Sequence, residues 1–274
     1  MSIIGMVSLD STAYLIGKIM GDGHLEKNLG SCYFSSGDFT SLSLLREFIA
    51  TEFGIDVQRT IIKQQVTERG RSYKLRIHST KFSRFLFSKG APRGKKVEQP
   101  FFIPSWIYEQ REYQRKFLQA ILEDELTTIK IEKGSHSVGI QFKMSKINEF
   151  IPQHYLFMKQ IKSMLESFSI ECGNLRLQEN KEDLSRTRIY FAIQRNKENL
   201  IRFKEQVGFF LNLEKSKQLE YSYLIFKSTL RPKIDLNEIQ KLRLKGLTIR
   251  EIATKNKISH THVHRLLQKM SLKN

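Results

Sequence analysis

Cysteine and long apolar stretches are both scarce in this chain. Its 274 residues include only two cysteines, Cys32 and Cys172, which are too few and too far apart for a disulfide framework or a metal knuckle. We interpret them as reduced, buried thiols of a cytosolic protein. No apolar run reaches the roughly 18 residues that indicate a membrane-spanning helix.

The N-terminal segment also lacks the signature of a signal peptide. Met1–Asp10 contains no basic region followed by an apolar stretch. We therefore expect a protein that is not secreted and that works in the cytoplasm, associated with the nucleoid, or in an organelle.

Acidic residues are few relative to basic ones. The chain has 28 Asp and Glu against 46 Lys and Arg, a formal net charge of +18. The basic residues do not gather on one amphipathic helix, as they would in a protein that binds a membrane surface. The charge therefore predicts a nucleic-acid partner. The alternative is a solubilising lysine-rich surface, on which the charges would be spread without pattern.

The order of predicted elements divides the chain into three parts. We expect an α+β fold of two similar halves, 1–106 and 107–230, followed by a small all-helical domain at 231–274, where Arg231-Pro232 interrupts a helical stretch. Each half has the order helix, hairpin, helix, hairpin, helix. In the first half the predicted helices are 11–21 (capped by Asp10 or Ser11), 40–53 and 80–89, with a turn at 27–30 and strands near 57–66 and 72–78. In the second half they are 108–125, 146–168 and 197–207, with a turn at Gly134-Ser135 and strands near 174–179 and 187–194.

The predicted strands alternate apolar residues with Lys, Arg and Gln. Leu75 and Ile77 mark an apolar face in the first half, and Leu175, Leu177 and Ile189 mark one in the second. The opposite face is basic and nearly free of acids, and such side chains contact phosphates and base edges. We predict that this face binds DNA through Lys74, Arg76, His78, Gln141, Lys143, Arg176, Gln178, Arg188, Tyr190 and Gln194.

Two glycines and an acid end the first predicted helix. Gly17 and Gly21 are four residues apart and share one face. Because glycine inside a helix costs about 1 kcal/mol relative to alanine, we expect another backbone to approach that face closely. Asp22 then stands at the negative end of the helix dipole, where a bound cation would stabilise its carboxylate.

A second segment, Phe117–Leu126, aligns with the first. The alignment pairs Gly17 with Ala120 and Asp22 with Glu125. Two helices packed along this face would end together and place two carboxylates side by side, an arrangement that a divalent metal neutralises. Carboxylate oxygens suit Mg²⁺, and the pattern is typical of metal-assisted phosphodiester hydrolysis.

These two segments resemble the LAGLIDADG motifs of homing endonucleases. The resemblance covers about residues 10–225 and implies an αββαββα fold in each half, pseudo-twofold symmetry, motif helices at the interface and a DNA-binding saddle formed by the two sheets. It implies Mg²⁺, with Mn²⁺ or Ca²⁺ as other occupants, held by Asp22 and Glu125 with Gly21 and Asp124 beside them. The second motif departs from the family pattern, since Asp124 aligns with Gly21 and Leu126 with Gly23. The acidic run Glu123–Glu125 also leaves open which acid is the second ligand.

The same resemblance implies a catalytic basic residue near the end of each half. Lys96 and Lys215 are our candidates, with Lys95 and Lys217 as close neighbours. Such a cation would stabilise negative charge that develops on the phosphate or help to activate water.

The C-terminal segment resembles the helix-turn-helix of resolvase-type DNA-binding proteins. Residues 231–274 contain 11 Lys and Arg against 3 Asp and Glu, and Thr248 with Glu251 forms a predicted capping box. The expected recognition helix begins at Ser259, and its DNA-facing residues are Ser259, His260, Thr261, His262 and Arg265. The alternative is a small trihelical core without DNA contact.

Together these features predict a monomeric, site-specific double-strand DNA endonuclease that recognises a long, asymmetric site. Two alternatives remain open on the same scaffold. One is a DNA-binding transcription regulator with a helix-turn-helix, and the other is a maturase that binds intron RNA.

Overall fold

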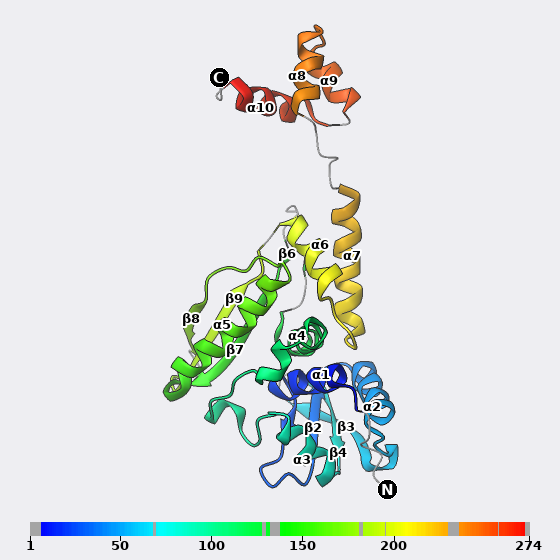
Figure 1. The fold of residues 1–274 in the computed structure, drawn as a ribbon, viewed down its shortest axis with the longest axis vertical. Coiled ribbons are helices and arrows are strands. Elements are labelled where there is room, and N and C mark those ends of the chain that lie inside the picture. The colour runs from blue at the N-terminus through cyan, green and yellow to red at the C-terminus, as the bar shows by residue number, and fades with distance from the viewer. Residues whose placement is uncertain are drawn as a thin grey trace. The chain divides into compact units, whose positions relative to one another are not determined.

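The computed structural model divides into two compact units, Met1–Phe226 and Lys227–Asn274, which are considered separately (Figure 1). No helix in the part of the chain described here is both long and apolar enough to cross a membrane. The predicted α+β class is confirmed for these residues. The structure describes residues 7–67, 70–127, 130–131, 138–180, 183–194, 196–229, 236–256 and 258–271.

The first part of the larger unit is a four-stranded antiparallel sheet covered by helices. The strand order is β1-β2-β4-β3, with cross-strand pairs such as Ser35 with Lys74 and Tyr33 with Arg76. Its helices are α1 (Leu9–Met20), α2 (Phe39–Phe53) and α3 (Thr80–Ser88). Its strands are β1 (His24–Leu25), β2 (Cys32–Ser36), β3 (Thr60–Thr67) and β4 (Gly70–Ile77).

The second part of the larger unit contains a three-stranded antiparallel sheet of order β7-β9-β8 and a short pair, β5-β6. The order β7-β9-β8 repeats β2-β4-β3 of the first part. Its helices are α4 (Arg111–Glu125), α5 (Ile151–Ser167), α6 (Lys197–Gln206) and α7 (Leu213–Thr229). Its strands are β5 (Lys130–Ile131), β6 (Val138–Gly139), β7 (Gln141–Ile147), β8 (Arg176–Glu179) and β9 (Arg186–Ala192).

One hydrophobic core joins these two parts. Leu15 of α1, Phe117 of α4 and Phe191 of β9 are fully buried in it, and α1 lies beside α4 (Figure 1). Local signals agree with the structure at the ends of α2. The Asp38 carboxylate accepts hydrogen bonds from the backbone N–H groups of the first turn, and Gly54 ends the helix in the left-handed conformation, with φ of 61°.

Three predicted helix starts are wrong. Helix α4 begins at Arg111 instead of 108, because Ser105–Tyr108 forms a separate 3-10 turn and Gln110 is extended. Helix α1 begins at Leu9 after Ser8, so neither Asp10 nor Ser11 is its cap, and Asp10 lies in the first turn, where the helix dipole favours a carboxylate. Helix α5 begins at Ile151 with a proline in its first turn, because Lys146 continues β7 by pairing with β9. The predicted turn at Gly134-Ser135 lies outside the described residues.

The predicted burial of Leu177 is also wrong. This side chain is 57% exposed, whereas Ile189 opposite it on β9 is fully buried. The difference arises because β8 is the edge strand of its sheet. Leu175, just before β8, packs against the core as predicted.

Among the described residues of the smaller unit, three complete helices surround a separate core. Ile239, Ile252 and Val263 are fully buried and come from one helix each. The predicted capping box of Thr248 and Glu251 is confirmed, with both reciprocal hydrogen bonds present. The helices are α8 (Leu236–Leu244), α9 (Ile249–Lys255) and α10 (His260–Ser271).

Candidate active site and nucleic-acid interface

Helices α1 and α4 meet through small residues. A Cβ atom added to Gly17 would lie 2.6 Å from the carbonyl oxygen of Phe117 and 2.8 Å from the Cβ of Ala120. Real side chains do not approach so closely, so only glycine fits at this position. The glycine spacing predicted this approach, and the contact brings the C-terminal ends of the two helices together.

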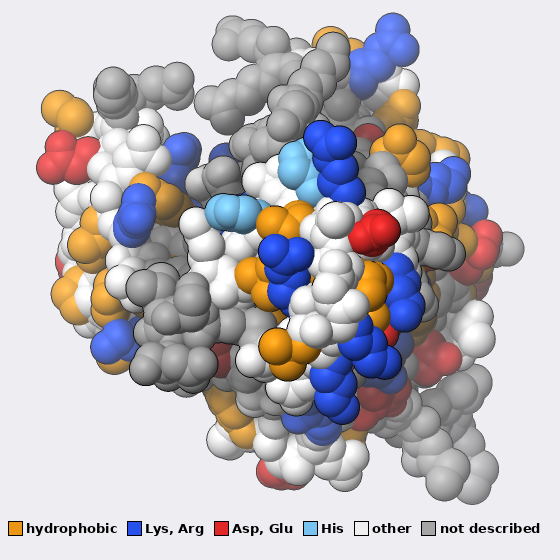
Figure 2. All heavy atoms as spheres, turned by 90° about the horizontal axis from the view of Figure 1, so that it is seen from above, with side chains coloured by type: hydrophobic (Ala, Val, Ile, Leu, Met, Phe, Trp, Pro, Cys, Tyr) orange, Lys and Arg blue, Asp and Glu red, His pale blue; other side chains and the backbone are white. Residues whose placement is uncertain are grey.

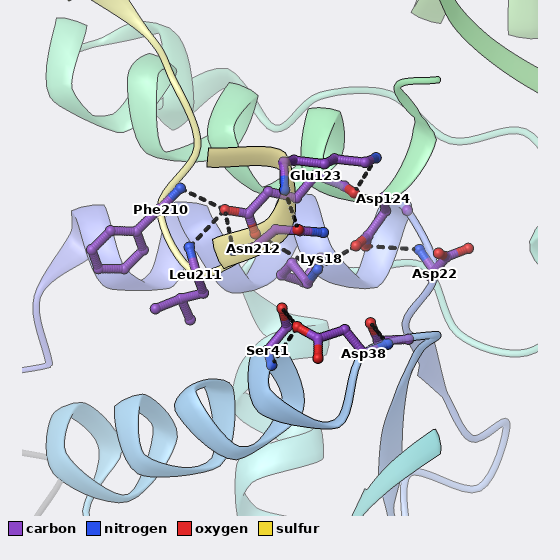
Figure 3. Close-up of polar contacts among 12 residues, drawn as sticks. Lys18, Asp22, Asp38, Ser41, Glu123, Asp124, Phe210, Leu211 and Asn212 are labelled. Carbon is purple, nitrogen blue, oxygen red and sulfur yellow. Dashed lines mark hydrogen bonds and ion pairs between the residues drawn. The ribbon is translucent and has the colours of Figure 1, made fainter. Parts of the chain in front are cut away.

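Asp22 comes just after α1, beyond the capping residue Gly21, and is exposed where it lines the cavities described below. Its backbone N–H donates to the Asp124 carboxylate at 2.9 Å, and its own carboxylate points away from that contact (Figure 3). The Lys18 ammonium also donates to Asp124 and forms an ion pair with it. Asp124 therefore ties the end of α4 to the end of α1.

Glu123, the first acid of the run Glu123–Glu125, has a structural role. Its side chain is 1% exposed, and one carboxylate oxygen accepts the backbone N–H groups of Phe210, Leu211 and Asn212 at 2.6, 2.7 and 3.3 Å (Figure 3). The other oxygen accepts the hydroxyl of Tyr14 at 2.5 Å. Glu123 thus holds the segment before α7 in place.

Glu125 lines a larger cavity together with Asp22 and Lys96, whereas Glu123 and Asp124 line a smaller one with Asp22 and Lys215. Among the described residues, no hydrogen bond or ion pair engages the Glu125 carboxylate. Burial, followed by the negative charge of Asp22, raises the pKa of Glu125. Asp22 is exposed as a residue, yet the protein around its carboxylate removes part of its hydration, and this desolvation, followed by the charge of Asp124, raises the pKa of Asp22 to about 6. A site in which desolvation and neighbouring carboxylates disfavour the ionised form of two acids attracts a cation.

Each predicted lysine reaches the end of one motif helix. The Lys96 ammonium donates to the carbonyls of Ile19 at 2.8 Å and of Gly21. The Lys215 ammonium donates to the carbonyls of Glu123 at 2.7 Å and Leu126 at 2.6 Å. These carbonyls are the acceptors that a helix end leaves without partners. Burial lowers the pKa of both lysines, against the opposing effect of the nearby carboxylates.

A cavity of about 600 Å³ gathers much of the predicted site. It is lined by the acids Asp22 and Glu125, by Lys96, and by polar residues of both sheets. A smaller cavity of about 190 Å³ contains Lys215 and is also lined by Asp22. The predicted residues that line the larger cavity are Gly21, Asp22, Lys74, Lys96, Glu125, Lys143 and Arg188.

Several lining residues of the larger cavity were not predicted. They include His24, which stacks on Tyr33 at 4.7 Å between ring centroids, with the Lys74 ammonium 4.4 Å from the Tyr33 ring. The alternation of β2 could have indicated Tyr33 and Ser35 as part of the polar face. Lys146 could not have been found in this way, because it belongs to the apolar face of β7. The full set of unpredicted polar residues is His24, Tyr33, Ser35, Gln65, Ser145 and Lys146.

The other predicted DNA-facing residues of the sheets lie outside this cavity. On the second sheet, strand register places Lys143 beside Tyr190 and Tyr190 beside Arg176, on one face. On the first sheet, Arg76 is paired with Glu26 at 3.1 Å, so part of its charge is neutralised. The residues outside the cavity are Arg76, His78, Gln141, Arg176, Gln178, Tyr190 and Gln194.

The predicted recognition residues of the smaller unit begin α10. Ser259, His260, Thr261 and Arg265 are exposed, and His262 is half-buried. Figure 2 looks onto this unit from above and shows Lys, Arg and His side chains on its surface. The arrangement leaves the first turn of α10 accessible to a partner.

A divalent metal would have two carboxylates available in the larger cavity. Among the described residues, no three or more His, Cys, Asp or Glu side chains are arranged so that together they could hold a metal ion. The Gly21 carbonyl already accepts from Lys96, and Asp124 from Lys18. Asp22 and Glu125 therefore remain as donors, which suits Mg²⁺, an ion that keeps several waters and takes one or two carboxylates with substrate phosphate.

Comparisons with known proteins give partial matches to proteins of different kinds. No family model matches the sequence. The chain is 30% identical over 232 residues to the DNA-directed RNA polymerase subunit Rpo1N of Methanocaldococcus jannaschii, covering 77% of the chain and 16% of that subunit. It is 27% identical over 237 residues to the tRNA-splicing ligase RtcB of Methanopyrus kandleri, covering 82% and 23%. It is 24% identical over 255 residues to the replication factor C small subunit of Methanocaldococcus jannaschii, covering 89% and 13%. The chain thus spans less than a quarter of each relative.

Two solved structures have a distant similarity of fold. One is a variant of I-DmoI in complex with its target DNA in the presence of manganese, with a TM-score of 0.45 at 12% identity, covering 73% of this chain and 93% of that one. The other is the N-terminal LAGLIDADG domain of DUF199/WhiA, with a TM-score of 0.47 at 14% identity, covering 79% and 89%.

Proposed function

We propose that this chain is a metal-dependent, site-specific DNA endonuclease of the LAGLIDADG type. The observation that carries the proposal is that Asp22 and Glu125, from two helices held together at Gly17, line one cavity with Lys96. Polar and basic residues of both sheets, including Lys74 and Arg188, line the same cavity. A phosphodiester would therefore meet carboxylates, a cation and a basic surface together.

The matches to parts of larger proteins support the view that this chain is an independent unit. The names Rpo1N, RtcB and replication factor C small subunit denote three different activities, yet each protein contains a segment similar to most of this chain. A segment common to such different proteins, and amounting to less than a quarter of each, is expected of an independent unit with its own activity. A DNA endonuclease is such a unit.

In this proposal the acids, the lysines and the residues of the sheets have different roles. Asp22 and Glu125 would hold Mg²⁺, which supplies Lewis-acid stabilisation of the phosphate and lowers the pKa of water. Lys96 and Lys215 place positive charge beside the carboxylates, where it stabilises negative charge that develops on phosphate oxygens. The basic face of the two sheets positions a duplex over the cavity.

Symmetry and the C-terminal unit complete the proposal. The repeated order of β2-β4-β3 and β7-β9-β8 supports two halves related by an approximate twofold axis. Because the two halves differ in sequence, a single chain would read a long asymmetric site as a monomer. The exposed first turn of α10 supports a helix-turn-helix that adds contacts to the same DNA.

The test is a selection of cleavage sites from random duplex DNA with Mg²⁺ at a stated salt concentration. We expect the unaltered chain to cut a long site and Asp22→Asn to reduce cleavage by at least about 100-fold while it keeps binding. The matched control is Asp10→Asn, which removes a carboxylate from the first turn of α1, outside either cavity. Normal cleavage by Asp22→Asn would refute the assignment. Binding without any cleavage would indicate a transcription regulator, and preferred binding of intron RNA a maturase.

A further inference from the structure

Lys146 is a buried cation in the second half of the larger unit. It lies on the apolar face of β7, which it shares with Phe142 and Met144, and is only 2% exposed. Its ammonium donates to the backbone carbonyls of Lys96 and of Gln99, the latter at 2.9 Å. Among the described residues, no carboxylate forms an ion pair with it.

Burial of this charge lowers the stability of the fold unless its contacts compensate for the lost hydration, so its presence calls for an explanation. An ammonium without a counter-ion loses several kcal/mol of hydration, to order of magnitude, when it is buried, and two carbonyls and the ring of Phe101, 3.8 Å away, offset only part of that loss. Burial, followed by the charge of Lys96, accordingly lowers the pKa of Lys146 to about 7. A leucine or methionine would fill the same space without this cost.

The contacts of Lys146 lead directly to the candidate active site. Its two acceptors belong to the segment Lys96–Gln99 of the first half. From this segment the Lys96 side chain reaches the carbonyls of Ile19 and Gly21, at the end of α1. Asp22 follows immediately. Lys146 thus connects the sheet of one half to the catalytic candidate of the other.

We propose that Lys146 is a positioning residue that holds Lys96 in its catalytic place and has no such effect on Lys215. This inference rests on the proposed endonuclease function. Lys215 is held by other means, because Glu123 binds the backbone of the segment that precedes it and Asn212 caps the Lys215 N–H. The two lysines also line different cavities.

The consequence is an asymmetric loss of activity. If each lysine serves the cleavage of one DNA strand, displacement of Lys96 slows one strand and leaves the other nearly unchanged. A misplacement of about 1 Å costs up to about 100-fold in rate. A purely structural role would instead lower the rates on both strands together.

The experiment uses Lys146→Met in the full chain. Methionine keeps the volume and removes the donor, and loss of a buried unpaired charge does not by itself destabilise a protein. The cleavage rate of each strand is measured with end-labelled duplex carrying the selected site. The control is Lys159→Met, which removes an exposed lysine of α5. Amide hydrogen exchange over residues 95–99 is measured in parallel, because it reports the anchoring of this segment without any cleavage.

We expect Lys146→Met to slow one strand by about 10- to 100-fold, the other by less than about twofold, and to accelerate exchange over residues 95–99. Equal slowing of both strands, or unchanged exchange, would overturn the inference. If the unaltered chain cuts neither strand, the proposed function fails, and exchange alone decides whether Lys146 anchors Lys96.

Discussion

The contact of Gly17 with α4 predicts that Gly17→Ala lowers the stability of the protein, although the same substitution raises the stability of an isolated helix. In an isolated helix, Gly17→Ala would stabilise by about 1 kcal/mol. Here the added methyl group would meet the Phe117 carbonyl oxygen at 2.6 Å and the Ala120 Cβ at 2.8 Å. Both atoms belong to or adjoin the α4 backbone, so neither can rotate away. Overpacking of this kind costs up to about 3 kcal/mol, which leaves a net loss of about 2 kcal/mol.

The assay is thermal and urea unfolding of the full chain and of Gly17→Ala. For a unit of this size, a loss of about 2 kcal/mol lowers the midpoint temperature by about 4–8 °C. Gly37→Ala is the control, because no atom lies within 4 Å of its added methyl group, and we expect a change within about 0.5 kcal/mol. A Gly17→Ala variant as stable as the unaltered chain, or more so, would show that α1 and α4 do not approach as described.

Two further predictions concern the acids. Glu123→Gln should lower the free energy of unfolding by about 1–3 kcal/mol, because hydrogen bonds to a charged acceptor become neutral. Chemical denaturation measures this loss, and Glu112→Gln, which removes half of an exposed ion pair, should change stability little. For Asp22, the folded pKa of about 6 exceeds its ordinary value of 3.8, so the folded state binds the proton more tightly. Stability in a chelator should therefore fall as the pH rises from about 4 to 6, and Mg²⁺ should restore it. Unfolding midpoints measured with and without Mg²⁺ test this, and a pH profile that Asp22→Asn leaves unchanged would contradict it.

Helix ends that depend on neighbouring residues could be predicted from the sequence. Gly54 ends α2 because it alone adopts the left-handed conformation without strain, and Thr248 with Glu251 begins α9 through reciprocal hydrogen bonds. The spacing of Gly17 and its alignment with Ala120 predicted a helix contact across the two halves. Each of these depends on residues a few positions apart, or on two segments that share one pattern.

Features that depend on tertiary surroundings were missed. Lys146 was expected to start a helix, because a lysine is unfavourable on the apolar face of a strand. In the structure it is accommodated there by hydrogen bonds to the carbonyls of Lys96 and Gln99, which the sequence pattern does not reveal. Leu177 was expected to be buried, since alternation does not reveal that β8 is an edge strand. The acidic run could not be resolved either. Glu123 is a structural anchor only because the segment from Phe210 to Asn212 returns to it.

The close packing of α1 on α4 makes the spacing of the two acids independent of the side chains on the outer faces of the sheets. The spacing of Asp22 and Glu125 is determined by the contact between helix backbones at Gly17, which involves no strand residue. Side chains such as Lys143 and Arg176 stand on strands whose apolar faces carry the packing. If the proposed endonuclease function holds, substitutions at outward positions away from the cavity, such as Arg176, would change the DNA sequence that is bound while the spacing of Asp22 and Glu125 stays constant.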